Sequence, residues 1–210
     1  FAHTADGIMI LDSKRRIVTV NHAFTTITGY EAGEVVGRMF ARPQSVKIPG
    51  PTIYAVWEDV RSAGRWEGEV WNVRKNGEVY PMRLSLSAVY DQRHGAIDHY
   101  VGVFNDISSH KENEERLKFL ATHDPLTGLA NRSLLNDRLQ QAIYSAASYG
   151  ARLAVVFVDV DRFKYINDTL GHDVGDRLLQ VMAERFTSAV AATDTVARLG
   201  GDEFVLLLHG

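Results

Sequence analysis

Two stretches in the second half of the chain decide its fold: Leu153-Ala-Val-Val-Phe-Val-Asp-Val-Asp161 and Thr195-Val-Ala-Arg-Leu-Gly-Gly-Asp-Glu-Phe-Val-Leu-Leu-Leu208. The continuous apolar, β-branched content of the first predicts a buried strand over residues 153–158. The second predicts a hairpin whose acidic residues lie at the turn. If strand and hairpin are neighbours in one sheet, the carboxylates of Asp159, Asp202 and Glu203 come together.

Grouped carboxylates favour a hard divalent cation, because their mutual repulsion is removed by a metal that prefers oxygen ligands. The glycines Gly200 and Gly201 permit positive φ and leave room for a phosphate near the backbone. Taken alone, each motif has a simpler interpretation. Asp159-Val-Asp161 is then a solvated loop, and the hairpin tip is only a turn.

Further polar residues separate the strand from the hairpin. Lys164 and the segment Asn167–Asp176 are predicted to form a polar loop that leads from the strand into a helix. Ligand sites of α/β sheets commonly form on such loops. An earlier helical stripe, from Leu135 to Ala146, ends at Gly150.

The first half of the chain predicts an antiparallel sheet with short helices. Strands are expected over 7–12, 16–21, 66–74, 80–90 and 99–104, and helices at about 23–28 and 54–63. Asn76-Gly77 between two of these strands is a strong hairpin signal. Residues 108–121 are rich in helix formers and predict a polar connecting helix, capped by Ser108 or Ser109. Such a helix is either a passive linker or one strand of a parallel helix pair.

Composition excludes several classes of protein. Apolar residues make up 45% and charged residues 23% of the 210 residues, which excludes disorder as the dominant state. The net charge of −3 argues against a nucleic-acid binder. The absence of cysteine excludes disulfides, thiolate metal sites and a cysteine nucleophile.

Four motifs of the second half resemble the GGDEF domain of diguanylate cyclases. They are His123–Arg132, Asp159–Asp168, Gly171–Asp176 and Arg198–Phe204. The resemblance covers residues 122–210 and implies the N-terminal part of a palm-like α/β domain, incomplete at its C-terminal end. The family condenses two GTP molecules into cyclic di-GMP, with one GTP on each of two facing domains.

The resemblance assigns roles by position. Mg²⁺ or Mn²⁺ would be held by Asp159, the carbonyl of Val160, Asp202 and Glu203, and Asp202 would also be the general base. The GTP-binding positions are Asn167 and Asp176, which read guanine, together with Lys164, His172, Gly200 and Gly201. A carboxylate can accept the paired N–H groups of guanine, and adenine lacks that pair. His172 could instead only brace its loop.

Two departures from the family pattern matter. The family's inhibitory Arg-x-x-Asp site corresponds here to Ala191-Ala-Thr-Asp194, so the arginine is absent and we expect no product inhibition through Asp194. The family's domain also continues beyond the hairpin with basic residues that grip the phosphates of GTP. We therefore expect residues 1–210 alone to be inactive.

The first half resembles a PAS sensor domain over residues 1–107, which leaves 108–121 as a signalling helix. The resemblance rests on Ala5–Asp12, Val20–Phe24, Trp66–Glu69, Lys75–Tyr80 and Asp106–Ser108. Its ligand is unknown. A flavin-thiol photosensor is excluded by the lack of cysteine, and flavin beside Trp66 and Trp71 remains a candidate. A surface role is expected for His22 in preference to haem ligation.

Together these resemblances predict an α+β chain from a bacterial protein of cyclic di-GMP signalling. The leading hypothesis is a PAS-regulated diguanylate cyclase that dimerises through the PAS domain and the connecting helix. The rival is a GTP-binding GGDEF module that regulates a phosphodiesterase domain of the EAL type downstream. We expect a cytoplasmic location, with membrane or EAL segments outside this stretch as further alternatives, since no run of about 18 apolar residues occurs here.

Overall fold

The computed structural model describes residues 4–39, 53–91 and 93–210, so the first three residues of the predicted PAS domain lie outside the described part. The chain divides into two compact units at Glu112 and Asn113. Each unit combines an antiparallel sheet with helices, which confirms the predicted α+β class. None of the described helices is both long enough and apolar enough to cross a membrane.

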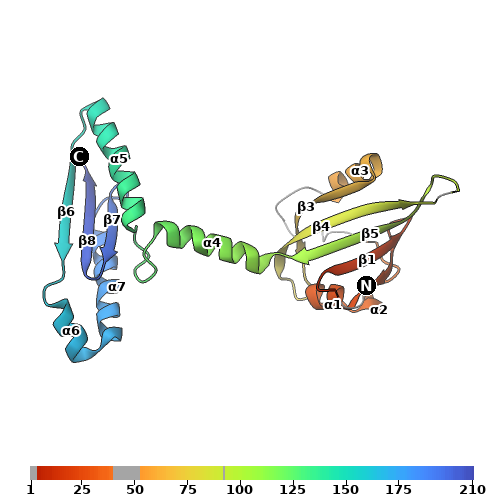
Figure 1. The fold of residues 1–210 in the computed structure, drawn as a ribbon, viewed down its shortest axis with the longest axis horizontal. Coiled ribbons are helices and arrows are strands. Elements are labelled where there is room, and N and C mark those ends of the chain that lie inside the picture. Colours follow the sequence, from red (N-terminus) through yellow and green to blue (C-terminus); the bar gives the residue numbers. More distant parts are fainter. Residues whose placement is uncertain (1–3, 40–52, 92) are drawn as a thin grey trace. The chain divides into compact units, whose positions relative to one another are not determined.

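The first unit is built on a five-stranded antiparallel sheet in the order β2-β1-β5-β4-β3 (Figure 1). Its elements are β1 (Gly7–Asp12), β2 (Ile17–Val20), α1 (His22–Thr28), α2 (Ala32–Val35), α3 (Ile53–Ala63), β3 (Arg65–Val73), β4 (Val79–Tyr90) and β5 (Ile97–Asp106). The predicted hairpin at Asn76-Gly77 is confirmed, since β3 and β4 pair in register on either side of it.

Alternation along β4 explains the core of the first unit. Tyr80, Met82, Leu84 and Leu86 are buried on one face, as the period of two requires. They pack with Phe24 of α1 and with residues of α3. Edge-to-face aromatic pairs add specific geometry, because Phe24 meets Phe104 at 5.6 Å and Trp57 meets Tyr100 at 5.1 Å between ring centroids.

The second unit is built on a three-stranded antiparallel sheet in the order β6-β8-β7 (Figure 1). Helix α4 (Ser108–Thr122) crosses the division between the units. It is followed by α5 (Arg132–Tyr149), β6 (Leu153–Asp159), α6 (Phe163–Leu170), α7 (His172–Ala189), β7 (Thr195–Gly200) and β8 (Glu203–His209). Alternate residues of β8 face different helices: Val205 packs in the cluster of α5, and Phe204 packs with Leu179 of α7. The sheet therefore lies between α5 and α7.

Three local predictions are wrong. The strand at 153–158 is present but largely exposed, because in the described residues β6 is an edge strand paired only with β8. The predicted polar loop between Asn167 and Asp176 is instead helical on both sides of Gly171. The start of α4 is held by Asp106, whose Oδ1 accepts the backbone N–H of Ser108 at 2.9 Å, and not by a serine side chain.

Candidate active site

The pairing of β6 with β8 positions the acidic residues. Asp159 is the last residue of β6 and stands opposite Glu203, the first residue of β8. Asp202 directly precedes Glu203 in the turn, and both Asp159 and Glu203 are exposed. Two carboxylates from sequence-distant motifs therefore meet at one end of the sheet, and a third residue, Asp202, is the neighbour of Glu203 in the chain.

The turn between β7 and β8 depends on glycine. Gly200 has φ of 143° and Gly201 has φ of 53°, and a side chain at either position would be strained. The ladder also shifts register between Arg198 and Gly200, so the pair of Gly200 with Glu203 that closes the turn is offset from the rest of the ladder.

The oxygen donors at this end fit a hard divalent cation in their chemistry. Asp159 and Glu203 offer carboxylates, and the carbonyl of Val160 accepts one hydrogen bond from the N–H of Phe163 at 3.2 Å and keeps a second lone pair. However, no three His, Cys, Asp or Glu side chains in the described part of the chain are grouped to hold a metal ion. Asp202 would have to turn toward the pair to complete such a group.

The two predicted guanine readers lie at the contact of α6 with α7. Asn167 is on α6, and its Oδ1 is buried without a hydrogen-bond partner among the described residues. It packs against Gly175 of α7, where an added Cβ would lie only 1.8 Å from that oxygen. Asp176, the next residue of α7, is exposed. The close approach of the two helices thus brings Asn167 beside the backbone that carries Asp176.

The other predicted GTP positions lie nearby in the chain but are less enclosed. Lys164 is an exposed residue of α6, and His172 is the exposed first residue of α7. Neither side chain lines a described cavity with the acidic residues. Asp159 and Glu203 border a small open hollow with Phe157 and Leu199.

The carboxylate of Asp194, the remaining residue of the inhibitory motif, already accepts hydrogen bonds from the protein backbone. Its two carboxylate oxygens accept the backbone N–H groups of Ala191 and His209, each at 2.9 Å. The hydrogen bond from His209, then that from Ala191, lowers the pKa of Asp194 below its usual value. This carboxylate closes its own turn and anchors the end of β8.

The first unit contains a cavity of about 190 Å³ against its sheet. Most of its wall is apolar, and Arg38, Glu34 and Asn72 add polar groups. That volume is below the ~300 Å³ at which pockets for drug-sized ligands usually begin. Neither Trp66 nor Trp71 lines it, and His22 is exposed at the start of α1.

Sequence reasoning gave no role to Arg74, Asp124 or Arg198. Arg74 donates to Asp106 at 2.6 Å and to the carbonyl of Ile27, and its guanidinium lies 4.0 Å from the ring centroid of Tyr80. Burial raises the pKa of that tyrosine to about 12. Asp124 and Arg198 stand in two of the quoted motifs and Arg74 ends a predicted strand, but the partner of each residue is far away in the sequence.

Comparisons with known proteins divide the chain in the same order. The family model described as "Diguanylate cyclase, GGDEF domain" matches residues 121–210, and the model for the PAS domain matches residues 5–109. A bifunctional diguanylate cyclase/cyclic di-GMP phosphodiesterase of Pseudomonas aeruginosa, MucR, is 55% identical over 99 residues, which are 47% of this chain and 14% of that protein.

Similarity extends across both units in other proteins. The probable diguanylate cyclase DgcE of Escherichia coli is 30% identical over 205 residues, which cover 97% of this chain and 18% of DgcE. A solved sensory box/GGDEF family protein of Caulobacter crescentus shares 48% identity with a TM-score of 0.42, over 42% of this chain and 57% of that one. The chain spans between 14% and 24% of the length of the first curated relatives it matches.

Proposed function

Because the chain belongs to the PAS family over residues 5–109 and to the diguanylate cyclase GGDEF family over residues 121–210, we propose that the protein containing it makes cyclic di-GMP from GTP. The observation that carries this proposal is the register of Asp159 with Glu203, with Asp202 in the adjoining turn. These carboxylates are the hard ligands that a metal–nucleotide complex requires.

The proposed chemistry forms two phosphodiester bonds between two GTP molecules. In each step the 3′-hydroxyl of one GTP attacks the α-phosphate of the other, and pyrophosphate leaves. Asp202 would accept the hydroxyl proton, while Asn167 and Asp176 would hold guanine. Bound Mg²⁺ or Mn²⁺, held by Asp159, the Val160 carbonyl, Asp202 and Glu203, would supply Lewis-acid activation of the phosphate.

Each domain would hold one GTP, so synthesis needs two copies face to face. Helix α4 supports this requirement, because it has no buried residue among its 15 and exposes Leu117, Phe119 and Leu120. Exposed apolar residues on a polar helix are suited to pairing with a second such helix. We therefore propose that α4 pairs with its counterpart when the protein dimerises.

The test is synthesis by the full-length protein supplied with GTP and Mg²⁺. We expect cyclic di-GMP from the natural protein and at least about a 100-fold loss in Asp202→Asn, because a general base contributes that much or more. Asp137→Asn, a change of the same type at an exposed position of α5, is expected to leave the rate unchanged. No product at any enzyme concentration would exclude the cyclase.

A second candidate is a GTP-binding module that controls another domain without turnover. A relative whose name gives a phosphodiesterase activity alone favours it: the cyclic di-GMP phosphodiesterase NbdA of Pseudomonas aeruginosa is 47% identical over 91 residues, which are 43% of this chain and 12% of that protein. In that case GTP should bind the full-length protein with no cyclic di-GMP formed, and should change the rate of an attached phosphodiesterase. Calorimetry with a non-hydrolysable GTP analogue, run beside the synthesis assay, separates the two candidates.

A further inference from the structure

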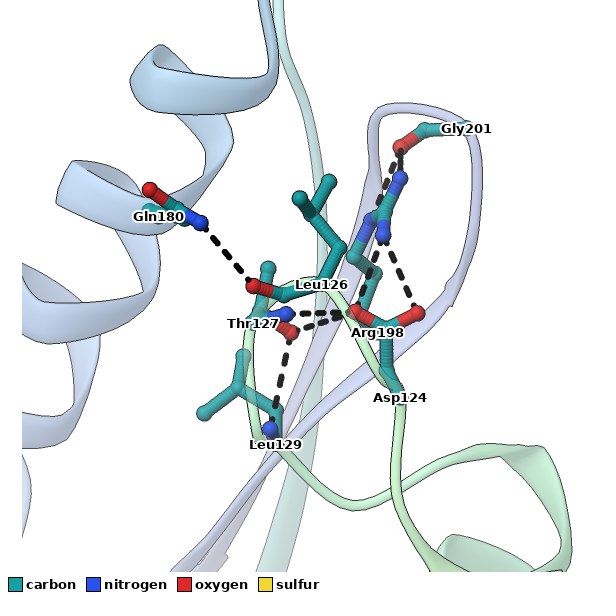
Figure 2. Close-up of polar contacts among 7 residues, drawn as sticks. All are labelled: Asp124, Leu126, Thr127, Leu129, Gln180, Arg198 and Gly201. Carbon is teal, nitrogen blue, oxygen red and sulfur yellow. Dashed lines mark hydrogen bonds and ion pairs between the residues drawn. The ribbon is translucent and has the colours of Figure 1, made fainter. Parts of the chain in front are cut away.

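The turn that precedes Asp202 is held by one arginine. Figure 2 shows the guanidinium of Arg198 between the carboxylate of Asp124 and the carbonyl of Gly201. Nε and Nη2 donate to the Gly201 oxygen at 2.9 and 2.7 Å. Nη1 donates to Oδ1 and Oδ2 of Asp124 at 2.9 and 3.0 Å. One side chain thus binds both the turn and a loop 74 residues earlier in the chain.

This contact fixes the direction of the Asp202 backbone. The carbonyl of Gly201 and the N–H of Asp202 belong to the same planar peptide group. Holding the carbonyl therefore holds the plane from which Asp202 departs. With φ positive at Gly200 and Gly201 and the ladder register broken just before Gly200, the turn would otherwise have several conformations open to it.

The carboxylate end of the pair is equally constrained. Asp124 Oδ1 also accepts the N–H of Thr127 at 2.9 Å and its hydroxyl at 2.6 Å. Partial burial alone would raise the pKa of Asp124, but the hydrogen bonds from Thr127 and Arg198 outweigh it and lower that pKa. The Asp124 and Arg198 side chains are only 16% and 11% exposed, so this charge pair is shielded from solvent.

The same loop is bound to α4 and to α7. The N–H of Asn131 donates to the carbonyl of Thr122 in the last turn of α4, at 2.9 Å. The N–H of Arg198 donates to the carbonyl of Ala130, also at 2.9 Å. From α7, Gln180 donates to the carbonyl of Leu126 at 3.3 Å (Figure 2). Hydrogen bonds thus run without a break from the end of α4 to the turn before Asp202.

We propose that Asp124 and Arg198 are positioning residues: their ion pair fixes the Gly200-Gly201 turn for catalysis by Asp202 and Glu203 and connects this turn to the end of α4. The inference rests on the proposed function. The proposal separates the binding of GTP from the chemical step, because the predicted guanine readers Asn167 and Asp176 belong to α6 and α7 and not to the turn. Loss of the pair should therefore slow the chemical step more than it weakens the binding of GTP.

The experiment compares Asp124→Asn and Arg198→Lys in the full-length protein. Asparagine keeps a hydrogen-bond acceptor but loses the charge, and lysine keeps the charge but cannot hold Asp124 and Gly201 together. We expect kcat to fall at least about tenfold, with KM for GTP changed less than about threefold, because small displacements of reacting groups cost rate steeply. Asp137→Asn and Arg185→Lys, matched changes at exposed positions, should behave as the natural protein.

Hydrogen exchange at the backbone amides of residues 201–203 provides a readout independent of activity. This exchange should become at least about tenfold faster in both variants, since the turn opens more often without the ion pair of Asp124 and Arg198. Natural kcat in both, or lost activity with unchanged exchange at the turn, would overturn the proposal. If Asp124→Asn unfolds, Arg198→Lys decides alone. If the natural protein makes no cyclic di-GMP, the proposed function fails, and the exchange result still decides the positioning role.

Discussion

Gly175 shows how much can depend on a missing side chain. Its replacement by alanine would put a methyl group 1.8 Å from Asn167 Oδ1, so the asparagine must move. If Asn167 reads guanine, we expect Gly175→Ala to weaken binding of a GTP analogue at least about tenfold, the equivalent of one hydrogen bond. Calorimetry on the full-length protein measures the change.

The control for this variant is Gly33→Ala in α2, where an added Cβ meets nothing within 4 Å. That change should leave nucleotide affinity as it is and keep or slightly raise the melting temperature, because alanine favours the helix. Undiminished affinity in Gly175→Ala, with a native melting temperature, would contradict a role for Asn167 in guanine reading.

At the residue scale, sequence patterns identified the side chains expected to take part in the reaction, but not the side chains that hold them in position. Asp159, Asp202 and Glu203 stand out because acidic residues beside glycine or at the end of a strand are conspicuous. The role of Arg198 depends on a partner 74 residues away, which no local pattern reveals. Long-range ion pairs become visible only when the strands are placed.

At the scale of the element, the start of α4 is the informative case. Asp106 accepts hydrogen bonds from the first N–H of this helix and from the guanidinium of Arg74. One carboxylate therefore stabilises both the β3–β4 hairpin and the N-terminus of α4. We expect Asp106→Asn to lower the free energy of unfolding by about 1–3 kcal/mol, the cost of weakening hydrogen bonds to a charged group. Urea unfolding followed by circular dichroism measures it.

A matched acidic-to-amide change is available on α3. Glu58→Gln removes an ion pair with Arg61 in which both side chains are well exposed, and such pairs contribute about 0–1 kcal/mol. Equal losses in Asp106→Asn and Glu58→Gln would show that Asp106 is an ordinary surface carboxylate.

The elements themselves were predictable wherever their pattern was regular. The strands of the first unit alternate cleanly, because one face of their sheet is covered by α1 and α3. The prediction of a buried strand was wrong at β6, because a continuous apolar run shows that a strand could be buried but not whether another element covers it. It also missed α6, whose polar residues resemble those of a loop.

At the scale of the whole molecule, each unit carries a carboxyl of lowered pKa at its connection with α4. Burial opposes the shift in both, and hydrogen bonds from Arg74 and Ser108 to Asp106, and from Thr127 and Arg198 to Asp124, outweigh it. The folded chain then binds fewer protons than the unfolded chain around pH ~4. Their stabilisation is complete above the unfolded pKa and is lost as the pH falls through the folded pKa.

We therefore expect both units to become less stable as the pH falls below about 5. The double variant Asp106→Asn/Asp124→Asn should have lower stability at pH 7 and a flatter decline toward pH 3, because asparagine does not titrate. Denaturant unfolding at several pH values gives the slope. A double variant with the slope of the natural protein would assign the acid sensitivity to other carboxyls.

The division of the chain into a PAS and a GGDEF region was predictable, because motifs in a fixed order identify families even when individual contacts cannot be foreseen. The contacts that connect the elements within one unit were not predictable. The link from α4 through residues 123–131 to the hairpin combines backbone hydrogen bonds, which leave no trace in residue type, with an ion pair whose partners lie 74 residues apart.

The exposed edge of β6 has a practical consequence. In the described part of the chain this strand pairs on one side only, and Val155, Val156 and Phe157 are 38%, 41% and 73% exposed. An open strand with apolar side chains is a template for another strand, so concentrated samples of these 210 residues would be prone to join edge to edge. Sedimentation of such a sample would then measure association through the edge of β6. The dimerisation proposed for cyclic di-GMP synthesis is better measured in the intact protein.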